Sequence, residues 1–181
     1  MAELKLLTIC GALRAASTNR LLVKEAVLAF GPASMVEANL RFPLFDEDIE
    51  TGPGIPQEVQ TLADQIAAAD AVVISTPEYN KALPGVLKNA LDWVSRTKGI
   101  TWRGKAVAII SAADGRGGGD RSQFSLRLAM VPLMARVLPG PEVMVAHSRE
   151  AFDEQGKLKD AHYVKALAEL MALLRTEAAR N

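Results

Sequence analysis

The sequence predicts an α/β protein built on a doubly wound parallel sheet. Short aliphatic runs recur along the chain, segments with helical periodicity separate them, and loops rich in glycine, proline and polar residues follow several of the runs. Strands that are apolar at nearly every position are typical of a parallel sheet that is covered on both faces. The helices between them supply the crossover connections that parallel strands require.

The predicted elements alternate regularly. The strands are expected at residues 4–10, 35–40, 71–75, 106–110 and 142–146. The helices are expected at residues 21–28, 57–69, 83–96, 122–138 and 159–178. In the second helix, apolar residues from Val59 to Ile66 recur with the i, i+3, i+4, i+7 spacing of an amphipathic helix. Pro132 should kink or shorten the fourth helix, because proline lacks the amide hydrogen that helices use.

Five such units in 181 residues predict a flavodoxin-like, five-stranded parallel sheet of order 2-1-3-4-5 with helices on both faces. A single domain spanning residues 1–181 is expected, since no linker or internal repeat divides the chain. In this topology ligands bind at the carboxyl ends of the strands, near the switch point between the first and third strands. The loops after Cys10, Ser75 and Ser111 should therefore meet.

Composition argues against several classes of partner. The chain has 21 basic and 21 acidic residues, and no segment concentrates Lys or Arg as a nucleic-acid or anionic-membrane surface would. The single cysteine, Cys10, excludes an intrachain disulfide and a four-cysteine zinc site, and it should be a small core residue. No segment reaches the ~18 apolar residues of a membrane span, and no signal peptide is recognised. A cytoplasmic location is expected.

The segment from residue 41 to residue 56 is predicted to be a long loop, because it contains Pro43, Pro53 and Pro56 with nearby glycines. Loops of ~12–15 residues or more without secondary structure are usually lids or partner contacts. Its four acidic residues do not match the spacing of a calcium loop, so we assign no metal site.

The first strand leads into a loop rich in hydrogen-bond donors. Arg14, the Ser17 and Thr18 hydroxyls, the Asn19 amide and the N–H groups of the following helix can together bind an anion. The ligand should therefore carry a terminal phosphate. The alternative is that Ser17 or Thr18 only caps the helix while Arg14 lies in solvent.

The loops after the third and fourth strands suit a planar ligand. Glu78, Tyr79 and Asn80, next to Pro77, offer edge hydrogen bonds and a flat apolar surface; the alternative is a turn with Tyr79 packed on the helix. Four glycines at residues 115–119 expose backbone N–H groups for a carbonyl edge, or else form a mobile loop. Neither the loop after the first strand nor the loop after the fourth strand contains G-x-G-x-x-G, so a typical dinucleotide-binding Rossmann site is not supported.

Three motifs resemble those of the NADPH-dependent FMN reductase family. The first loop resembles G-S-x-R-x-x-S-x-N, residues 76–93 resemble T-P-E-Y-N-x-x-x-P-G-x-L-K-N-A-x-D-W, and residues 111–127 resemble S-x-x-x-G-x-x-G-G-x-x-x-Q-x-x-L-R. They occur in the family's order, and the resemblance covers essentially the whole chain. It implies tightly bound FMN, hydride transfer from NADPH or NADH, and electron transfer to quinones, free flavins, azo compounds or, in some members, chromate. The two half-reactions would share one site and need no catalytic acid, base or nucleophile.

The resemblance also implies roles for individual residues. It places the ribityl phosphate at Ala12, Leu13, Arg14, Ser17, Thr18 and Asn19. It places the flavin ring at Pro77, Glu78, Tyr79 and Asn80, and the polar edge of the ring at Ser111, Gly115 and Gly118. The chain departs from the family at Ala12, where serine is usual, and at Phe124, where tyrosine is frequent near a subunit contact. His147 and His162 are expected to be structural or surface residues.

Two other functions stay open from the sequence. A one-electron flavodoxin-type carrier or a flavin redox sensor would not turn over NAD(P)H; such carriers tend to be acidic, so the balanced charge favours the enzyme. A structural protein with a decayed site is suggested only by Ala12. A homodimer or homotetramer is expected from the resemblance, with Leu87, Leu91, Trp93 and the loop at 41–56 as a possible interface, although core burial of the two leucines is the competing interpretation.

Overall fold

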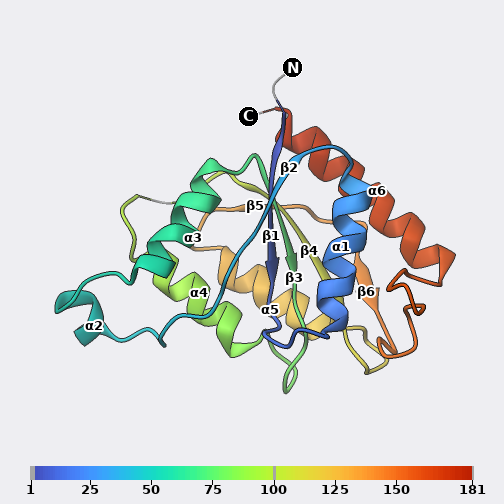
Figure 1. Cartoon of the computed structure of the whole chain (residues 1–181), viewed down its shortest axis with the longest axis horizontal. Coiled ribbons are helices and arrows are strands. Elements are labelled where there is room, and N and C mark those ends of the chain that lie inside the picture. Colours follow the sequence, from blue (N-terminus) through green and yellow to red (C-terminus); the bar gives the residue numbers. More distant parts are fainter. Residues whose placement is uncertain (1–2, 100, 181) are drawn as a thin grey trace.

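The computed structural model describes residues 3–99 and 101–180. Its strands are β1 Lys5–Cys10, β2 Ser34–Glu37, β3 Ala71–Ser75, β4 Ala106–Ala112, β5 Arg136–Val137 and β6 Val143–Val145. Its helices are α1 Thr18–Phe30, α2 Glu47–Thr51, α3 Gln57–Ala68, α4 Gly85–Ser95, α5 Asp120–Met130 and α6 Ala161–Ala178. Helices and strands alternate as predicted, except that α2 is followed directly by α3 and β5 directly by β6 (Figure 1).

The strands form one parallel sheet of order β2-β1-β3-β4-β5, which confirms the predicted topology. The sheet has six strands among the described residues instead of five, because two short strands share its last position. β5 pairs with the start of β4, and β6 pairs with the end of β4. The strand predicted at 142–146 corresponds to β6.

The helix predicted at residues 122–138 was wrong at its C-terminal end. α5 ends at Met130, and Arg136 and Val137 belong to β5. Pro132 has no amide hydrogen to continue the helical bonding, and Met134 has a φ of 58°, which turns the chain back toward the sheet. The loop at 41–56 also differs from the prediction, because Asp46 caps the short helix α2 within it.

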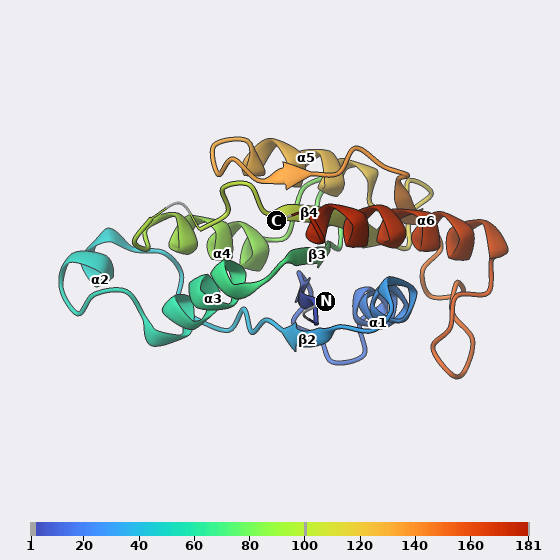
Figure 2. The ribbon, with the colours of Figure 1, turned by 90° about the horizontal axis from the view of Figure 1, so that it is seen from above.

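Helices cover the sheet on both faces. α1 and α6 pack on one face, and α3, α4 and α5 pack on the other (Figure 2). Successive strand residues alternate between the two layers, so that Val72 packs under α3 and α4 while Val73 packs under α1 and α6. This burial on both sides explains why the strands are apolar at nearly every position. In the part of the chain that the structure describes, no helix is long and apolar enough to cross a bilayer.

The long loop is held against α4 by polar contacts. Asn89 Nδ2 and Trp93 Nε1 both donate to the carbonyl of Pro43, at 3.0 and 2.8 Å. The backbone N–H of Phe45 donates to Asn89 Oδ1 at 2.8 Å, and the Phe45 ring meets Trp93 edge to face. Trp93 is fully buried by these contacts, and Leu87 and Leu91 of the same helix are also buried. These three residues are therefore core of the protomer, which agrees with the competing interpretation of the two leucines.

Candidate functional site

The three predicted loops meet at the carboxyl edge of the sheet, at the lower edge of Figure 1. The strands that precede them are neighbours, with Cys10 opposite Ser75 and Ser75 opposite Ile110. The hydrogen bonding continues beyond the strands, because the N–H of Gly11 donates to Ser75 O at 2.8 Å and that of Thr76 donates to Ile110 O at 2.9 Å. These bonds fix the first residues of the loops relative to one another.

Two adjacent hollows lie between these loops. The first, here called the loop pocket, has a volume of about 280 Å³ and is lined by Arg14, Ser17, Thr18, Asn19, Pro77, Glu78, Tyr79, Ala112, Ala113, Asp114, Ser148 and Arg149. The second, here called the glycine pocket, has a volume of about 620 Å³ and is lined by Glu78 and residues 113–121. Both are lined by Glu78, Ala113 and Asp114, so they are adjacent. Small-molecule sites have volumes of ~300–1,000 Å³.

The first loop both caps α1 and lines part of the loop pocket. Ser17 is the N-cap of α1, and its Oγ accepts a hydrogen bond from Asn19 N at 3.2 Å. Ser17, Thr18 and the exposed Arg14 still line the loop pocket, and the first turn of α1 contains no acidic residue. The positive end of the helix dipole therefore faces the pocket without an opposing carboxylate from that turn.

Ala12 and Leu13 do not line the loop pocket. The side chain of Ala12 is buried, and Leu13 packs against the core under α3 and α4. The carbonyl of Leu13 accepts a hydrogen bond from Arg41 Nη2 at 2.9 Å. Arg41 thereby connects the long loop to the first loop. Nothing in the sequence around Arg41 indicated this contact.

Asn19 ties three elements together. Its side-chain Nδ2 donates to Ala112 O at 2.8 Å, and its Oδ1 accepts from Ala112 N at 3.1 Å and from Ser75 Oγ at 2.8 Å. The residue is 2% exposed. Its amide therefore joins the start of α1 to the ends of β3 and β4, and it determines how the walls of the loop pocket sit relative to one another.

The second loop forms a tight hairpin at the lower tip of Figure 1. Tyr79 and Ala82 exchange backbone hydrogen bonds, and the two residues between them, Asn80 and Lys81, have φ angles of 51° and 66°. These angles are those of a type I′ turn. Tyr79 is 55% exposed at the mouth of the loop pocket, so it does not pack on the helix. Asn80 is at the tip of the hairpin and does not line either pocket.

The second loop is also attached to α5. Ser122 Oγ donates to the carbonyl of Pro77 at 2.8 Å, and the backbone N–H of Ser122 donates to Glu78 Oε2 at 3.2 Å. The Glu78 carboxylate thus accepts a hydrogen bond in the first turn of α5, where the helix dipole stabilises negative charge. These bonds hold in place Pro77, which lines the loop pocket, and Glu78, which lines both pockets.

The glycine-rich loop is shaped mainly by contacts within the protein. Ser111 Oγ donates to Gly118 O at 2.7 Å and accepts from Gln123 Nε2 at 2.9 Å, and Ser111 is fully buried. Gly118 is buried with a φ of 59°, against the backbone of Met144. Gly115 and Gly118 line the glycine pocket, whereas Ser111 lines neither pocket.

A fourth loop, which follows β6, contributes residues that the sequence did not indicate. Ser148 N donates to Ala113 O at 3.2 Å, and Arg149 Nε lies 3.4 Å from Asp114 Oδ2. Ser148 and Arg149 both line the loop pocket. The pairing of β6 with the end of β4 brings this loop to the site, and no local motif in the sequence marks it. His147 precedes them and is exposed, as is His162.

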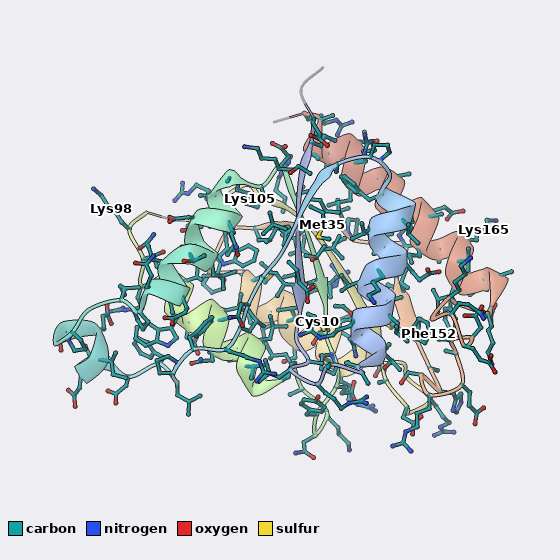
Figure 3. The ribbon with its side chains drawn as sticks, viewed as in Figure 1. Cys10, Met35, Lys98, Lys105, Phe152 and Lys165 are labelled. Atoms are coloured by element: carbon teal, nitrogen blue, oxygen red, sulfur yellow. The ribbon has the colours of Figure 1, made fainter. Side chains whose placement is uncertain are left out.

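Cys10 lies beneath the first loop, near the end of β1 (Figure 3). It is 5% exposed, which confirms that it is a small core residue. Burial raises the pKa of its thiol, an effect only partly offset by a backbone hydrogen bond with Ala12 and by the charge of Arg20. Its thiol should therefore react slowly with alkylating reagents.

A model of the family described as NADPH-dependent FMN reductase matches residues 4–150. The chain belongs to the NADPH-dependent FMN reductase family. The reductase is 42% identical over 160 residues to an NAD(P)H-dependent FMN reductase of Pseudomonas aeruginosa, a match that covers 87% of this chain and 86% of the relative. It is 41% identical over 158 residues to a quinone reductase of Escherichia coli, covering 84% and 83% of the two chains.

A solved structure supports the same assignment. The reductase superposes with a TM-score of 0.87 on FerB, a flavoenzyme NAD(P)H:(acceptor) oxidoreductase from Paracoccus denitrificans, at 26% identity and with 99% and 98% of the chains covered. The predicted flavodoxin-like fold and the predicted family are thus confirmed. Family membership makes the protein an oxidoreductase with FMN as cofactor and NAD(P)H as reductant.

Proposed function

We propose that the reductase holds FMN across the loop pocket and the glycine pocket, and uses NAD(P)H to reduce small acceptors, with quinones as the first class. The observation that carries the proposal is a pair of adjacent hollows, one of which is lined by a cation and hydroxyls together with Pro77 and Tyr79. The quinone reductase relative supports the acceptor class. Free flavins, azo compounds and chromate are further candidate acceptors. NAD(P)H supply favours the cytoplasm as the site of action.

The residues present fit FMN. Arg14, Ser17 and Thr18 at the N-terminus of α1 would hold the phosphate, because cationic, hydroxyl and N–H donors converge there. Pro77 and Tyr79 would contact the faces and edge of the flavin ring. Bound FMN supplies the hydride and electron chemistry, while the protein binds and orients it. Gly115 and Gly118 have no side chains, so the backbone at these two positions could approach the flavin ring closely.

We propose further that NAD(P)H and the acceptor occupy the same place in turn. Tyr79 in the lining of the loop pocket is largely exposed, and the glycine pocket lies next to it. Steady-state rates with varied NADPH and varied benzoquinone should give parallel lines in a double-reciprocal plot. Intersecting lines would argue for a ternary complex. An FMN-loaded protein that failed to oxidise NADPH would instead be a carrier or a sensor.

Replacing Arg14 with alanine should weaken FMN binding by about 1.5–3 kcal/mol, or roughly 10- to 150-fold, because a charge-assisted bond to the phosphate is lost. Fluorescence titration of apo-protein measures the dissociation constant. Arg103→Ala is the matched control, since Arg103 is an exposed arginine on the turn before β4, at the opposite end of the sheet. Equal affinities for wild type and Arg14→Ala would remove Arg14 from the site.

The reductase is also proposed to form a homodimer or homotetramer. α5 and the turn after it present an apolar stripe, here called the α5 stripe, in which Phe124, Leu128 and Val131 are 57%, 74% and 69% exposed. They recur at i, i+4 and i+7, so they share one face of the helix. Exposed apolar surface of this kind is typical of a protein contact. A monomeric mass in light scattering at micromolar concentration would contradict self-association.

A further inference from the structure

The loop pocket is lined by two cations and two carboxylates, and one pair of them is in contact. Its lining includes the cations Arg14 and Arg149 and the carboxylates Glu78 and Asp114. Glu78 accepts a backbone hydrogen bond from the first turn of α5. Asp114 has a different partner: its Oδ2 lies 3.4 Å from Arg149 Nε, so it links the glycine-rich loop to the loop after β6.

The backbones that carry this pair are hydrogen-bonded to each other, whereas its side chains are exposed. Ala113 N donates to Val145 O and Ser148 N donates to Ala113 O, at 3.0 and 3.2 Å, so the two loops are bonded to each other next to the pair. The side chains of Arg149 and Asp114 are 83% and 55% exposed. An ion pair this exposed contributes little stability, because water screens it and both side chains lose rotamer freedom.

A phosphate is a stronger partner for Arg149 than Asp114 is. It carries up to two negative charges and three acceptor oxygens, and guanidinium groups bind it through paired N–H donors. Arg149 lines the same pocket as Arg14, Ser17 and Thr18. A phosphate in that pocket would therefore lie within the field of two arginines, one from the start of the chain and one from its C-terminal third.

We propose that Arg149 is a second phosphate-binding residue and that Asp114 competes for it. In the absence of FMN the guanidinium pairs with Asp114, and on binding it exchanges this carboxylate for the FMN phosphate. The inference rests on the proposed position of FMN in the loop pocket. It makes two predictions of opposite sign, because loss of Arg149 weakens FMN binding and loss of the Asp114 charge strengthens it.

The experiment compares FMN with riboflavin, which lacks the phosphate, by fluorescence titration of apo-protein. Arg149→Ala should weaken FMN binding ~10-fold and leave riboflavin binding unchanged, with Arg149→Lys restoring part of the loss. Asp114→Asn should tighten FMN binding ~3-fold in the wild-type background and have no effect in the Arg149→Ala background. Glu150→Ala is the control, because Glu150 is an exposed neighbour in the same loop. Unfolding midpoints of all variants establish that the fold is intact.

Several results would overturn the inference. Unchanged FMN affinity in Arg149→Ala would exclude the residue as a ligand, while a loss in Arg14→Ala in the same series would keep the proposed FMN site. Equal weakening of FMN and riboflavin would show that Arg149 supports the ring or the loop. Tightening by Asp114→Asn that persists without Arg149 would show direct repulsion between Asp114 and the phosphate. Wild-type protein that binds neither flavin would reject the proposed function itself.

Discussion

Gly118→Ala is expected to lower the free energy of unfolding by about 3–5 kcal/mol, because it combines a strained backbone with a clash. Gly118 has a φ of 59°, a region that residues with a side chain rarely adopt. A Cβ at this position would lie 2.5 Å from the carbonyl carbon of Met144 and 3.0 Å from the backbone nitrogen of Ala146. These are backbone atoms beside and within β6, so they cannot rotate away.

Urea unfolding of the apo-protein measures this effect, and Gly115→Ala is the matched control. Gly115 lies in the same loop and lines the same pocket, but a Cβ there would meet nothing within 4 Å. We expect the control to change the free energy of unfolding by less than about 0.5 kcal/mol. A Gly118→Ala protein as stable as the control would show that the loop after β4 relaxes away from β6.

Asn19→Ala should lower the free energy of unfolding by about 3–4 kcal/mol, because it leaves buried polar groups without partners at a cost of about 1–3 kcal/mol each. The N–H and the carbonyl of Ala112 both bond to the Asn19 side chain, as does Ser75 Oγ. The loss should be present in apo-protein without any flavin, because all three bonds lie within the polypeptide.

Thr18→Ala serves as the control for Asn19. Thr18 is the preceding residue, lines the same pocket and is half-buried, so its replacement tests the pocket wall without touching the Asn19 bonds. Urea unfolding of the apo-proteins separates stability from flavin affinity, which a second titration with FMN measures. If Asn19→Ala lost FMN affinity with unchanged apo-stability, Asn19 would act as a direct phosphate ligand instead of a positioning residue.

The regular pattern of the chain predicted most of the fold. Buried strands such as Ala71–Ser75 are apolar throughout, and α3 repeats its apolar residues with helical spacing, so local sequence is sufficient to recognise both. The prediction failed at the end of α5 and at β5. There a stretch after Pro132 is too short and too mixed in polarity to show any period, and only its pairing with β4 makes it a strand.

Part of the lining of the two pockets could be expected from the sequence for a related reason. Seven of the thirteen predicted binding residues line the loop pocket, because they follow strands that meet at the switch point; those seven are Arg14, Ser17, Thr18, Asn19, Pro77, Glu78 and Tyr79. Gly115 and Gly118 line the glycine pocket. Ser148 and Arg149 were missed, because a loop joins this site only when β6 pairs with the end of β4.

The sequence by itself determined most of the strands and helices, the three motif loops and the family, because each depends on residues that are close together in the chain. The tertiary structure alone decided which donors remain available to a ligand. The Asn19 amide is used for Ala112 and Ser75, and Arg149 faces Asp114. Such partners are chosen by strand pairing and burial between segments far apart in sequence, and no local pattern encodes them.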